Sequence, residues 1–349
     1  MNERWGDVMD IGIFDHLDRG GKSDPQFYEE RIRIAQAFEA ADFYSYHVAE
    51  HHFTTLGMAP SPSVFLAAVA AQTKKLRMGP LVFALPLYHP LRLLQEICEL
   101  DNISHGRLDM GFGRGSSPIE AAYYGEETSQ DTYAESLEVI LQGLQTDRLT
   151  YHGKRFDFDN VPILLSPFQK PYPPIWYGVH SIEASERAAR RGLNMVSADS
   201  VAETRGFHDH YRKVWGETHP GETLPKLGLT RFVVVAETDE KAMDIARRAY
   251  GFWHESFHWL FRLHGKTPRL GERAKTYDQV IEEGRGIAGS PDTVAKFLAK
   301  QLEDSASNYF VGQFVFGDMS VDETIRSVEL FREKVCPQLD AVDAKLPVH

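Results

Sequence analysis

The sequence predicts an α/β protein with one domain, an eight-stranded parallel β/α barrel of the TIM type that carries insertions. Short apolar runs rich in β-branched and aromatic residues alternate with longer helical patterns along the chain. Eight such runs occur, and the helices between them imply parallel pairing, because parallel neighbours need long crossover connections. No linker-like change of composition divides the 349 residues. We therefore expect one closed barrel over residues 1–349 rather than two doubly wound domains.

The first half of the chain supplies four of the expected strands and the helices between them. The expected helix at 25–41 has apolar residues at helical spacing, and the one at 62–73 is rich in Ala, Val and Leu. A third helix, 90–103, opens with Pro90, and the first turn of a helix tolerates proline. The four strands are expected at 8–15, 43–49, 76–85 and 107–113.

The second half continues the alternation after a helical region that runs to about Asp147. A small hairpin is expected over 149–158, and a proline-rich connection, 162–174, leads into the next strand. A helix over 181–191 ends before Gly192, a residue typical of helix C-termini, and a final helix is expected from about 320 to 334. The remaining strands are expected at 175–179, 195–198, 231–236 and 309–316.

One segment, 263–289, is charged and contains glycine but shows no clear period. It lies where a barrel would carry the loop between its seventh and eighth strands, so we expect a mobile loop insertion that covers the barrel mouth. A dinucleotide-binding fold is disfavoured at the other end of the chain. The turn after the first strand, Asp15–Asp18, contains no glycine-rich fingerprint.

Composition excludes several classes of function. The net charge of −12 argues against a nucleic-acid partner and against an anionic membrane surface, which both need a basic protein surface. Cys98 and Cys336, the two cysteines, form neither a disulfide framework nor a metal-ligand spacing. The N-terminus lacks the apolar core of a signal peptide, and no run of about 18 apolar residues occurs. We therefore expect a cytoplasmic protein.

Polar residues follow the expected strands at their carboxyl ends, where β/α barrels carry their functional groups. These residues form a histidine-rich rim around an apolar mouth. In chain order they are Asp15, His16, Glu50, His51, His52, Arg114, His180, Ser181, Ser197 and Asp199.

The stretch Glu50–His52 is the most informative part of this rim. Adjacent residues at a strand end point to opposite sides, so we expect no metal ion shared by His51 and His52. One imidazole facing the mouth would instead serve as an acid or base, because histidine titrates near neutral pH. The alternative is that both histidines only cap or pack.

Two neighbouring strand ends carry the features of a phosphate site. Arg114 lies among glycines, which let the backbone approach a ligand closely, and a guanidinium makes fork-like contacts with phosphate. The helix expected after His180 begins at Ser181, where unpaired backbone N–H groups attract anions. The alternatives are a solvated surface arginine and an ordinary capped helix. Together, the two features indicate that both groups converge on one phosphate.

Several motifs resemble those of the luciferase-like monooxygenase family, which includes the alkanal monooxygenase subunits. They occur in the order of that family and cover roughly residues 8–340. The resemblance implies a bacterial-luciferase-like barrel that binds reduced FMN at its C-terminal face. The motifs are Val48–Phe53, Leu85–Arg92, Ser104–Leu108, Gly111–Gly115, Pro173–Trp176, Ala188–Gly192 and Gly289–Pro291.

The resemblance also assigns roles to individual residues. His51 matches the catalytic histidine, which Glu50 and His52 would orient. Arg114 matches the arginine that holds the FMN phosphate. Leu81 and Val82 fall where the family often has a non-prolyl cis peptide against the flavin ring. The phosphate-binding helix start corresponds to His180, Ser181 and Ala184.

Two positions depart from the pattern of the family. His180 stands where the alkanal-oxidising subunit has an acidic residue, which changes the chemistry of the phosphate loop. Gly113 replaces a larger side chain near the flavin, and the smaller residue is expected to widen the pocket or to change how the oxygenated flavin is stabilised.

The resemblance implies a two-component reaction. A separate flavin reductase would supply FMNH₂, since the sequence shows no nicotinamide fingerprint. Oxygen would add at the flavin C4a carbon, and the resulting peroxyflavin would oxygenate a small, mainly apolar organic substrate. The alternatives are a deazaflavin-dependent oxidoreductase on the same barrel and a non-catalytic flavin-binding protein.

Assembly and pocket lining are further expectations. The family resemblance implies a homodimer, with an apolar face formed by Ala67–Ala71 and Leu91–Cys98, although helix-to-barrel packing would give the same pattern. Aromatic residues near the strand ends indicate an apolar pocket, and core packing explains them equally well. They are Phe14, Phe83, Trp176 and Phe316.

Overall fold

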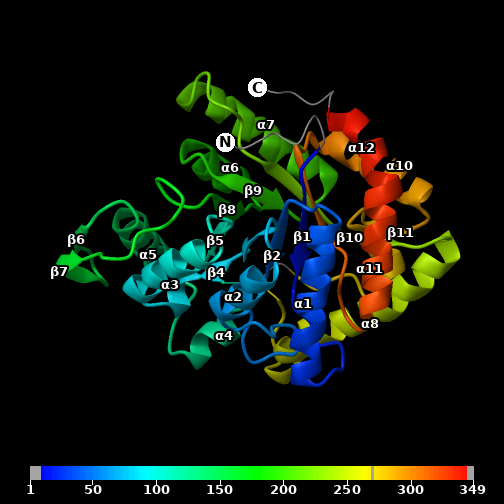
Figure 1. Cartoon of the computed structure of the whole chain (residues 1–349), viewed down its shortest axis with the longest axis horizontal. Coiled ribbons are helices and arrows are strands. Elements are labelled where there is room, and N and C mark those ends of the chain that lie inside the picture. The colour runs from blue at the N-terminus through cyan, green and yellow to red at the C-terminus, as the bar shows by residue number, and fades with distance from the viewer. Residues whose placement is uncertain (1–8, 116, 269–270, 344–349) are drawn as a thin grey trace.

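The strands form a nearly closed parallel barrel. The computed structural model describes residues 9–115, 117–268 and 271–343. It contains a parallel sheet of ten strands, of which β4 (Phe83–Ala84) pairs with β5 and β11 (Gly286–Gly289) pairs with β10 (Figure 1). The remaining eight form the ring. In chain order they are β1 (Ile11–Asp15), β2 (Ser45–Val48), β3 (Arg77–Pro80), β5 (Met110–Gly113), β8 (Ile175–Gly178), β9 (Asn194–Ser197), β10 (Leu227–Val235) and β12 (Tyr309–Gln313).

The pairing order explains how the ring closes. β1 lies between β2 and β12, and β12 pairs with β10, so the first and the last strand of the ring are neighbours. On the other side, Met78 of β3 and Leu108, just before β5, form an isolated parallel bridge. These eight strands are the ones that the sequence predicts, which confirms the predicted fold class.

The third predicted strand is interrupted where it passes the barrel mouth. β3 ends at Pro80 and β4 begins at Phe83, and the Leu81–Val82 peptide bond between them is cis. The cis peptide that the family resemblance implies is therefore present.

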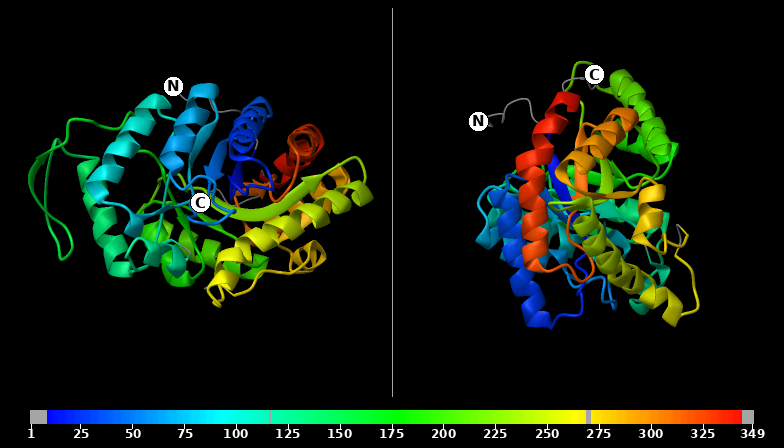
Figure 2. Two further views of the ribbon diagram at one scale, coloured as in Figure 1. Left: turned by 90° about the horizontal axis from the view of Figure 1, so that it is seen from below. Right: turned by 90° about the vertical axis from the view of Figure 1, so that its right-hand side faces the viewer.

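Helices surround the strands, and Figure 2 shows them on the outside of the barrel. Sharp helix starts are common. Three helices begin with a complete capping box, made by Ser200 with Glu203, Thr276 with Gln279 and Ser320 with Glu323. The helices are α1 (Asp24–Ala40), α2 (Pro62–Gln72), α3 (Pro90–Ile103), α4 (Pro118–Tyr123), α5 (Gln130–Gly143), α6 (Ile182–Arg190), α7 (Val201–Thr218), α8 (Asp239–Leu263), α9 (Tyr277–Glu282), α10 (Pro291–Ser305), α11 (Val321–Leu330) and α12 (Cys336–Asp343).

The barrel interior below the mouth is filled by side chains. Trp176, Val196, Tyr309 and Val311 form a buried cluster there, and His47 Nε2 lies 3.2 Å from the Tyr309 hydroxyl. Gly12 makes room for this packing, because a Cβ at that position would lie 2.0 Å from the Tyr309 hydroxyl oxygen. The closed lower layer leaves ligand space only toward the carboxyl ends of the strands.

One further predicted element is confirmed, and one differs in the structure. The hairpin is confirmed as β6 (Arg148–His152) and β7 (Asp157–Pro162), which project from the body beside α5 (Figure 1). The interpretation of 263–289 as a loop insertion needs correction, because it contains α9 and β11. The periodicity was missed because both elements are short and β11 is glycine-rich. Val8 and residues 269–270 of these predictions lie outside the described residues, and the mobility of the segment stays a prediction.

The apolar face expected for a homodimer is used within the chain. In α2, Val69 and Ala70 are buried, and in α3 Leu94, Ile97 and Cys98 are buried. Helix-to-barrel packing accounts for these residues, whereas Ala68 and Ala71 of the same face are exposed, and the homodimer stays a prediction. Among the described residues, no helix is both long enough and apolar enough to span a membrane.

Candidate active site

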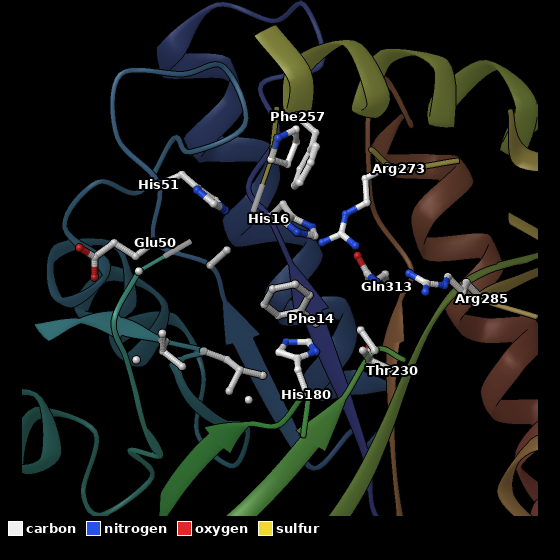
Figure 3. A pocket seen from close by; sticks show the side chains of 18 of the residues that line it. Phe14, His16, Glu50, His51, His180, Thr230, Phe257, Arg273, Arg285 and Gln313 are labelled. Carbon is white, nitrogen blue, oxygen red and sulfur yellow. The ribbon is translucent and has the colours of Figure 1, made fainter. Parts of the chain in front are cut away.

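A cavity of about 780 Å³ opens at the carboxyl ends of the strands. Residues following β1, β2, β5 and β8 line it, together with residues from β10, β12 and the segment before β11 (Figure 3). His51 and Arg114 both border this cavity, so the structure brings together the imidazole and the guanidinium that the sequence predicts to share one opening.

His51 is held by a carboxylate that the sequence analysis missed. Its Nδ1 donates to Glu120 Oε1 at 3.1 Å, and the other oxygen of Glu120 accepts the backbone N–H of His52 at 2.9 Å. Burial opposes protonation of His51, but the charge and hydrogen bond of Glu120 outweigh it, so the pKa of His51 is raised. Figure 3 shows the His51 ring directed toward the cavity.

Glu50 and His52 bind each other rather than His51. Glu50 accepts from His52 Nε2 at 2.8 Å, from the Ala84 N–H at 3.1 Å and from the Tyr88 hydroxyl at 3.0 Å. The prediction that this pair orients His51 is therefore corrected, since Glu120 does so. The carboxylate of Glu50 points away from the other labelled side chains in Figure 3, and His52 does not line the cavity. Strand-end neighbours diverge, as expected, and the rings of His51 and His52 contact different carboxylates.

A second imidazole, that of His16, lies beside His51. The two rings are stacked with centroids 6.2 Å apart, and the indole N–H of Trp253 donates to His16 Nδ1 at 3.3 Å. Burial lowers the pKa of His16 well below its usual value, and the charges of His51 and Arg273 lower it further. In this cavity, His51, whose pKa is raised, therefore lies next to His16, whose pKa is lowered. The position of His16 at a strand end was the signal for it in the sequence.

The residues of the predicted phosphate site lie along one cavity, and their role in binding phosphate stays a prediction. Ser181 caps α6, and its hydroxyl accepts the Ala184 N–H at 3.2 Å. Arg114 and Arg187 line this cavity, Arg187 lies in α6 itself, and the charges of both arginines act on Tyr133, another lining residue. Neither guanidinium has a hydrogen bond or ion pair within the described ranges, and the one carboxylate that the charge of Arg187 is seen to affect, Glu183, has only its pKa lowered by it. An anionic ligand would satisfy both.

His180 also lines the cavity, and it forms a hydrogen bond with the acidic residue Asp199. Its Nδ1 donates to Asp199 Oδ2 at 2.9 Å. Burial raises the pKa of Asp199, but the hydrogen bond and charge of His180 more than offset this, and the net shift is downward. An acidic group therefore does lie beside the phosphate loop, supplied by Asp199 after β9 rather than by the residue at position 180.

Gly113 does not widen the cavity. A Cβ at this position would lie 2.4 Å from Cγ2 of Val82, so Val82 occupies the space that a larger side chain would need. The expectation of a wider pocket is corrected for this reason: the glycine compensates for the branched residue across from it. Leu81 and Val82 both line the cavity, as predicted.

The remaining wall comes from residues that the sequence analysis did not single out. Trp253 and Phe257 of α8 form an aromatic surface, and Phe14 is the one member of the predicted aromatic set that lines the cavity. Phe83, Trp176 and Phe316 are buried in the core instead. Polar residues of this wall include Thr230, Glu272, Arg273, Glu283, Arg285 and Gln313.

Comparison with known proteins identifies relatives over most of the chain. The family described as luciferase-like monooxygenase matches residues 9–308. The chain is 38% identical over 318 residues to an uncharacterised protein, y4wF, of Sinorhizobium fredii, covering 90% of this chain and 93% of that one. It is 25% identical over 344 residues to the alkanal monooxygenase alpha chain of Photobacterium leiognathi, covering 91% and 95%. The oxygenase component of flavin-dependent trigonelline monooxygenase of Acinetobacter baylyi is 25% identical over 265 residues, 72% of each chain.

Solved structures share the fold. The monooxygenase RslO1 of Streptomyces bottropensis superposes with a TM-score of 0.83 at 25% identity, covering 94% of this chain and 99% of that one. The oxygenating constituent of 3,6-diketocamphane monooxygenase of Pseudomonas putida, in complex with FMN, gives 0.78 at 23%, covering 95% and 99%. An F420-dependent secondary alcohol dehydrogenase gives 0.70 at 19% identity, again covering 95% and 99%, which shows the fold alone.

Proposed function

Since the chain belongs to the luciferase-like monooxygenase family, we propose that it is an FMN-dependent monooxygenase. In this proposal a separate reductase supplies FMNH₂, and the protein uses O₂ to oxygenate a small organic molecule. One observation carries the proposal. The same cavity is bordered by His51, whose pKa is raised, and by the guanidiniums of Arg114 and Arg187, which form no hydrogen bond or ion pair in the part of the chain that the structure describes.

The residues present fit a flavin that ends in a phosphate. Arg114, Arg187 and the start of α6 at Ser181 would hold the phosphate, because positive charges and free N–H groups attract a dianion. Leu81 and Val82 would supply an apolar wall for the ring system. When bound, reduced FMN supplies the electrons with which O₂ is activated.

The chain's own part in the reaction is to hold a proton and to exclude water. His51 uses Nδ1 for Glu120, which leaves Nε2 toward the cavity as the atom that gives or takes a proton. Neutral His16 next to it adds no second positive charge at neutral pH. The aromatic surface of Trp253 and Phe257 shields this part of the cavity from water.

Names of the relatives support the two-component arrangement. The trigonelline enzyme is an oxygenase component, and the diketocamphane enzyme is an oxygenating constituent seen with FMN. By the same reasoning we propose a flavin reductase as the partner of this chain. No observation in the cavity favours a deazaflavin, and we retain the homodimer and a cytoplasmic location as further proposals.

Oxygen uptake tests the proposal. The protein is mixed with FMN and a flavin reductase, and substrate-dependent O₂ consumption is followed across long-chain aldehydes, cyclic ketones, terpenes and sulfonates. We expect uptake that is coupled to product for one class, and FMN binding that the Arg114→Gln variant weakens about tenfold while riboflavin binding is unchanged. Binding of a deazaflavin but not of FMN would overturn the proposal.

A further inference from the structure

We propose that Arg273 and Arg285, together with Thr230 and Gln313, form a subsite for a carboxylate or sulfonate group of the organic substrate. The inference rests on the proposed function, because it names the substrate class of the same cavity. These four residues, here called the arginine subsite, belong to a different sector of the barrel from Arg114. Thr230 and Gln313 lie on the paired strands β10 and β12, whereas Arg114 follows β5.

The two guanidiniums of the subsite face the cavity with little to neutralise them. The side chain of Arg273 has no hydrogen bond or ion pair in the part of the chain that the structure describes, and its guanidinium carbon lies 5.1 Å from the Phe257 ring centroid. Nε of Arg285 lies 3.5 Å from Glu283, and the charge of Arg285 also contributes to the lowered pKa of Asp199. Burial lowers the pKa of Arg273, and the charge of Arg285 lowers it further, so the two cations lie close enough to repel.

A third arginine adds positive charge beneath the subsite. Arg231 is completely buried and donates to neutral acceptors, Gln301 Oε1 at 2.9 Å and the carbonyls of Thr230 at 2.8 Å and Asp199 at 3.0 Å. Burial lowers the pKa of Arg231 to about 9, with a further contribution from the charge of Arg285. Its hydrogen-bond partners are neutral, and the Asp199 carboxylate offsets only part of the lowering of its pKa, so Arg231 adds positive charge that attracts an anion.

Two buried polar atoms in the same wall lack partners. Gln313 is 7% exposed and Thr230 is 9% exposed, and Gln313 Oε1 and Thr230 Oγ1 make no hydrogen bond within the described ranges. Buried polar atoms without partners are costly and rare, so a bound group is expected near both, and an anion would satisfy the Thr230 hydroxyl but not Gln313 Oε1, which only accepts. The threonine hydroxyl and the amide NH₂ can both donate to an anion. Figure 3 shows Gln313 between the two guanidiniums.

Acidic residues of this region do not occupy the subsite. Asp199 accepts from His180 at 2.9 Å and from the Ser197 hydroxyl at 3.3 Å. Glu272 and Glu283 line the cavity and are exposed to solvent, where water screens their charge. The guanidinium donors of Arg273 and the terminal donors of Arg285 therefore remain available to a ligand.

The aromatic residues beside the arginine subsite indicate the rest of the substrate, the part to which the anionic group is attached. Trp253, Phe257 and Phe261 line the same cavity beside the arginine subsite. An apolar body against these rings and one anionic group at the guanidiniums would use both surfaces. The substrate class that fits is a small amphiphilic organic anion, which refines the mainly apolar substrate expected from the sequence.

Calorimetry on the FMN-saturated protein tests the inference. FMN occupies the Arg114 region, so a second anion reports on the arginine subsite. The probes are octanoate and octane-1-sulfonate, with 1-octanol as the neutral match. We expect the anions to bind at least tenfold more tightly than octanol, and Arg273→Gln and Arg285→Gln each to reduce anion affinity about tenfold without changing octanol affinity. Arg205→Gln, which alters an exposed arginine paired with Asp209 on α7, is the matched control.

A charge-reversal variant distinguishes loss of the subsite from loss of the folded structure. Arg273→Glu should bind 1-octylammonium more tightly than the unmodified protein does, a gain that an unfolded protein cannot show. Equal affinity for octanoate and octanol, or arginine variants that lose FMN rather than octanoate, would overturn the inference. If the protein fails to bind FMN but prefers octanoate in its flavin-free form, the proposed function fails while the subsite stands.

Discussion

At the scale of single residues, the chemistry of the site depends on two neighbouring histidines with opposite preferences. Glu120 raises the pKa of His51, whereas burial, aided by the charges of His51 and Arg273, keeps the pKa of His16 low. Of the two adjacent imidazoles, His51 is the one that takes up a proton more readily. This arrangement suits a general acid or base that acts beside a bound cofactor.

Replacing His51 tests its role in turnover. We expect His51→Ala to lower kcat about 10²- to 10⁴-fold, the usual contribution of general acid–base catalysis, and to leave the Kd for FMN nearly unchanged. His152→Ala, an exposed histidine in the β6–β7 hairpin, is the control. Steady-state kinetics and flavin fluorescence measure the two quantities, and equal turnover of His51→Ala and the unmodified protein would refute the assignment.

Replacing Glu120 tests how the proton is held. Glu120→Gln keeps a hydrogen-bonding side chain but removes the charge, so the pKa of His51 should fall. Because His51 then loses its proton at lower pH, the limb of the pH–rate profile that reports His51 should move to lower pH. An unmoved profile would show that another group controls it.

At the scale of elements, the interrupted strand β3–β4 and the strand β5 shape the mouth together. Val82, between β3 and β4, fills the space above Gly113 at the end of β5. The glycine is therefore required by its neighbour across the sheet. In the sequence, Gly113 indicates a wider pocket, but in the structure it makes room for the side chain of Val82.

A pair of substitutions tests this close approach. Gly113→Ala should destabilise the protein by about 1–3 kcal/mol, the usual cost of overpacking, and Val82→Ala should restore most of it in the double variant. Gly178→Ala is the matched control, because Gly178 also lines the cavity and a Cβ there would meet nothing within 4 Å. Denaturant unfolding measures the free energies, and additive effects of the two substitutions would contradict the account.

The elements also show how far the sequence alone can lead. Alternating apolar runs predicted every strand of the ring, because buried parallel strands carry a strong local signal. Glu120 was missed because it lies 69 residues from His51 and only the folding of α4 over the mouth joins them. Arg273 and Arg285 were missed for a related reason. They lie in the segment interpreted as a loop, whose short strand β11 is defined by its pairing with β10.

At the scale of the whole molecule, buried neutral histidines make stability depend on pH. Burial lowers the pKa of His47 and of His208 to about 4 from 6.5, and both side chains are fully buried. A lowered pKa means that the unfolded chain binds more protons between these values. The free energy of unfolding should therefore fall as pH drops from about 6.5 toward 4.

His208 allows this dependence to be tested away from the cavity. Its Nδ1 donates to the Ser305 carbonyl at 2.9 Å, a bond that a glutamine amide can also make. His208→Gln should flatten the decline of unfolding free energy between pH 6.5 and 4 and leave FMN affinity unchanged. Denaturant unfolding at a series of pH values gives the slopes, and identical slopes in both proteins would be evidence against this role.

The central claim is that one cavity holds the flavin phosphate at Arg114 and the reacting part of the flavin beside His51. A crystal structure of the FMN complex tests it most directly. The account predicts phosphate oxygens within hydrogen-bond distance of Arg114 and the α6 N-terminus, with the ring system against Leu81, Val82 and His51. Phosphate bound at Arg273 and Arg285, or flavin outside this cavity, would contradict the claim.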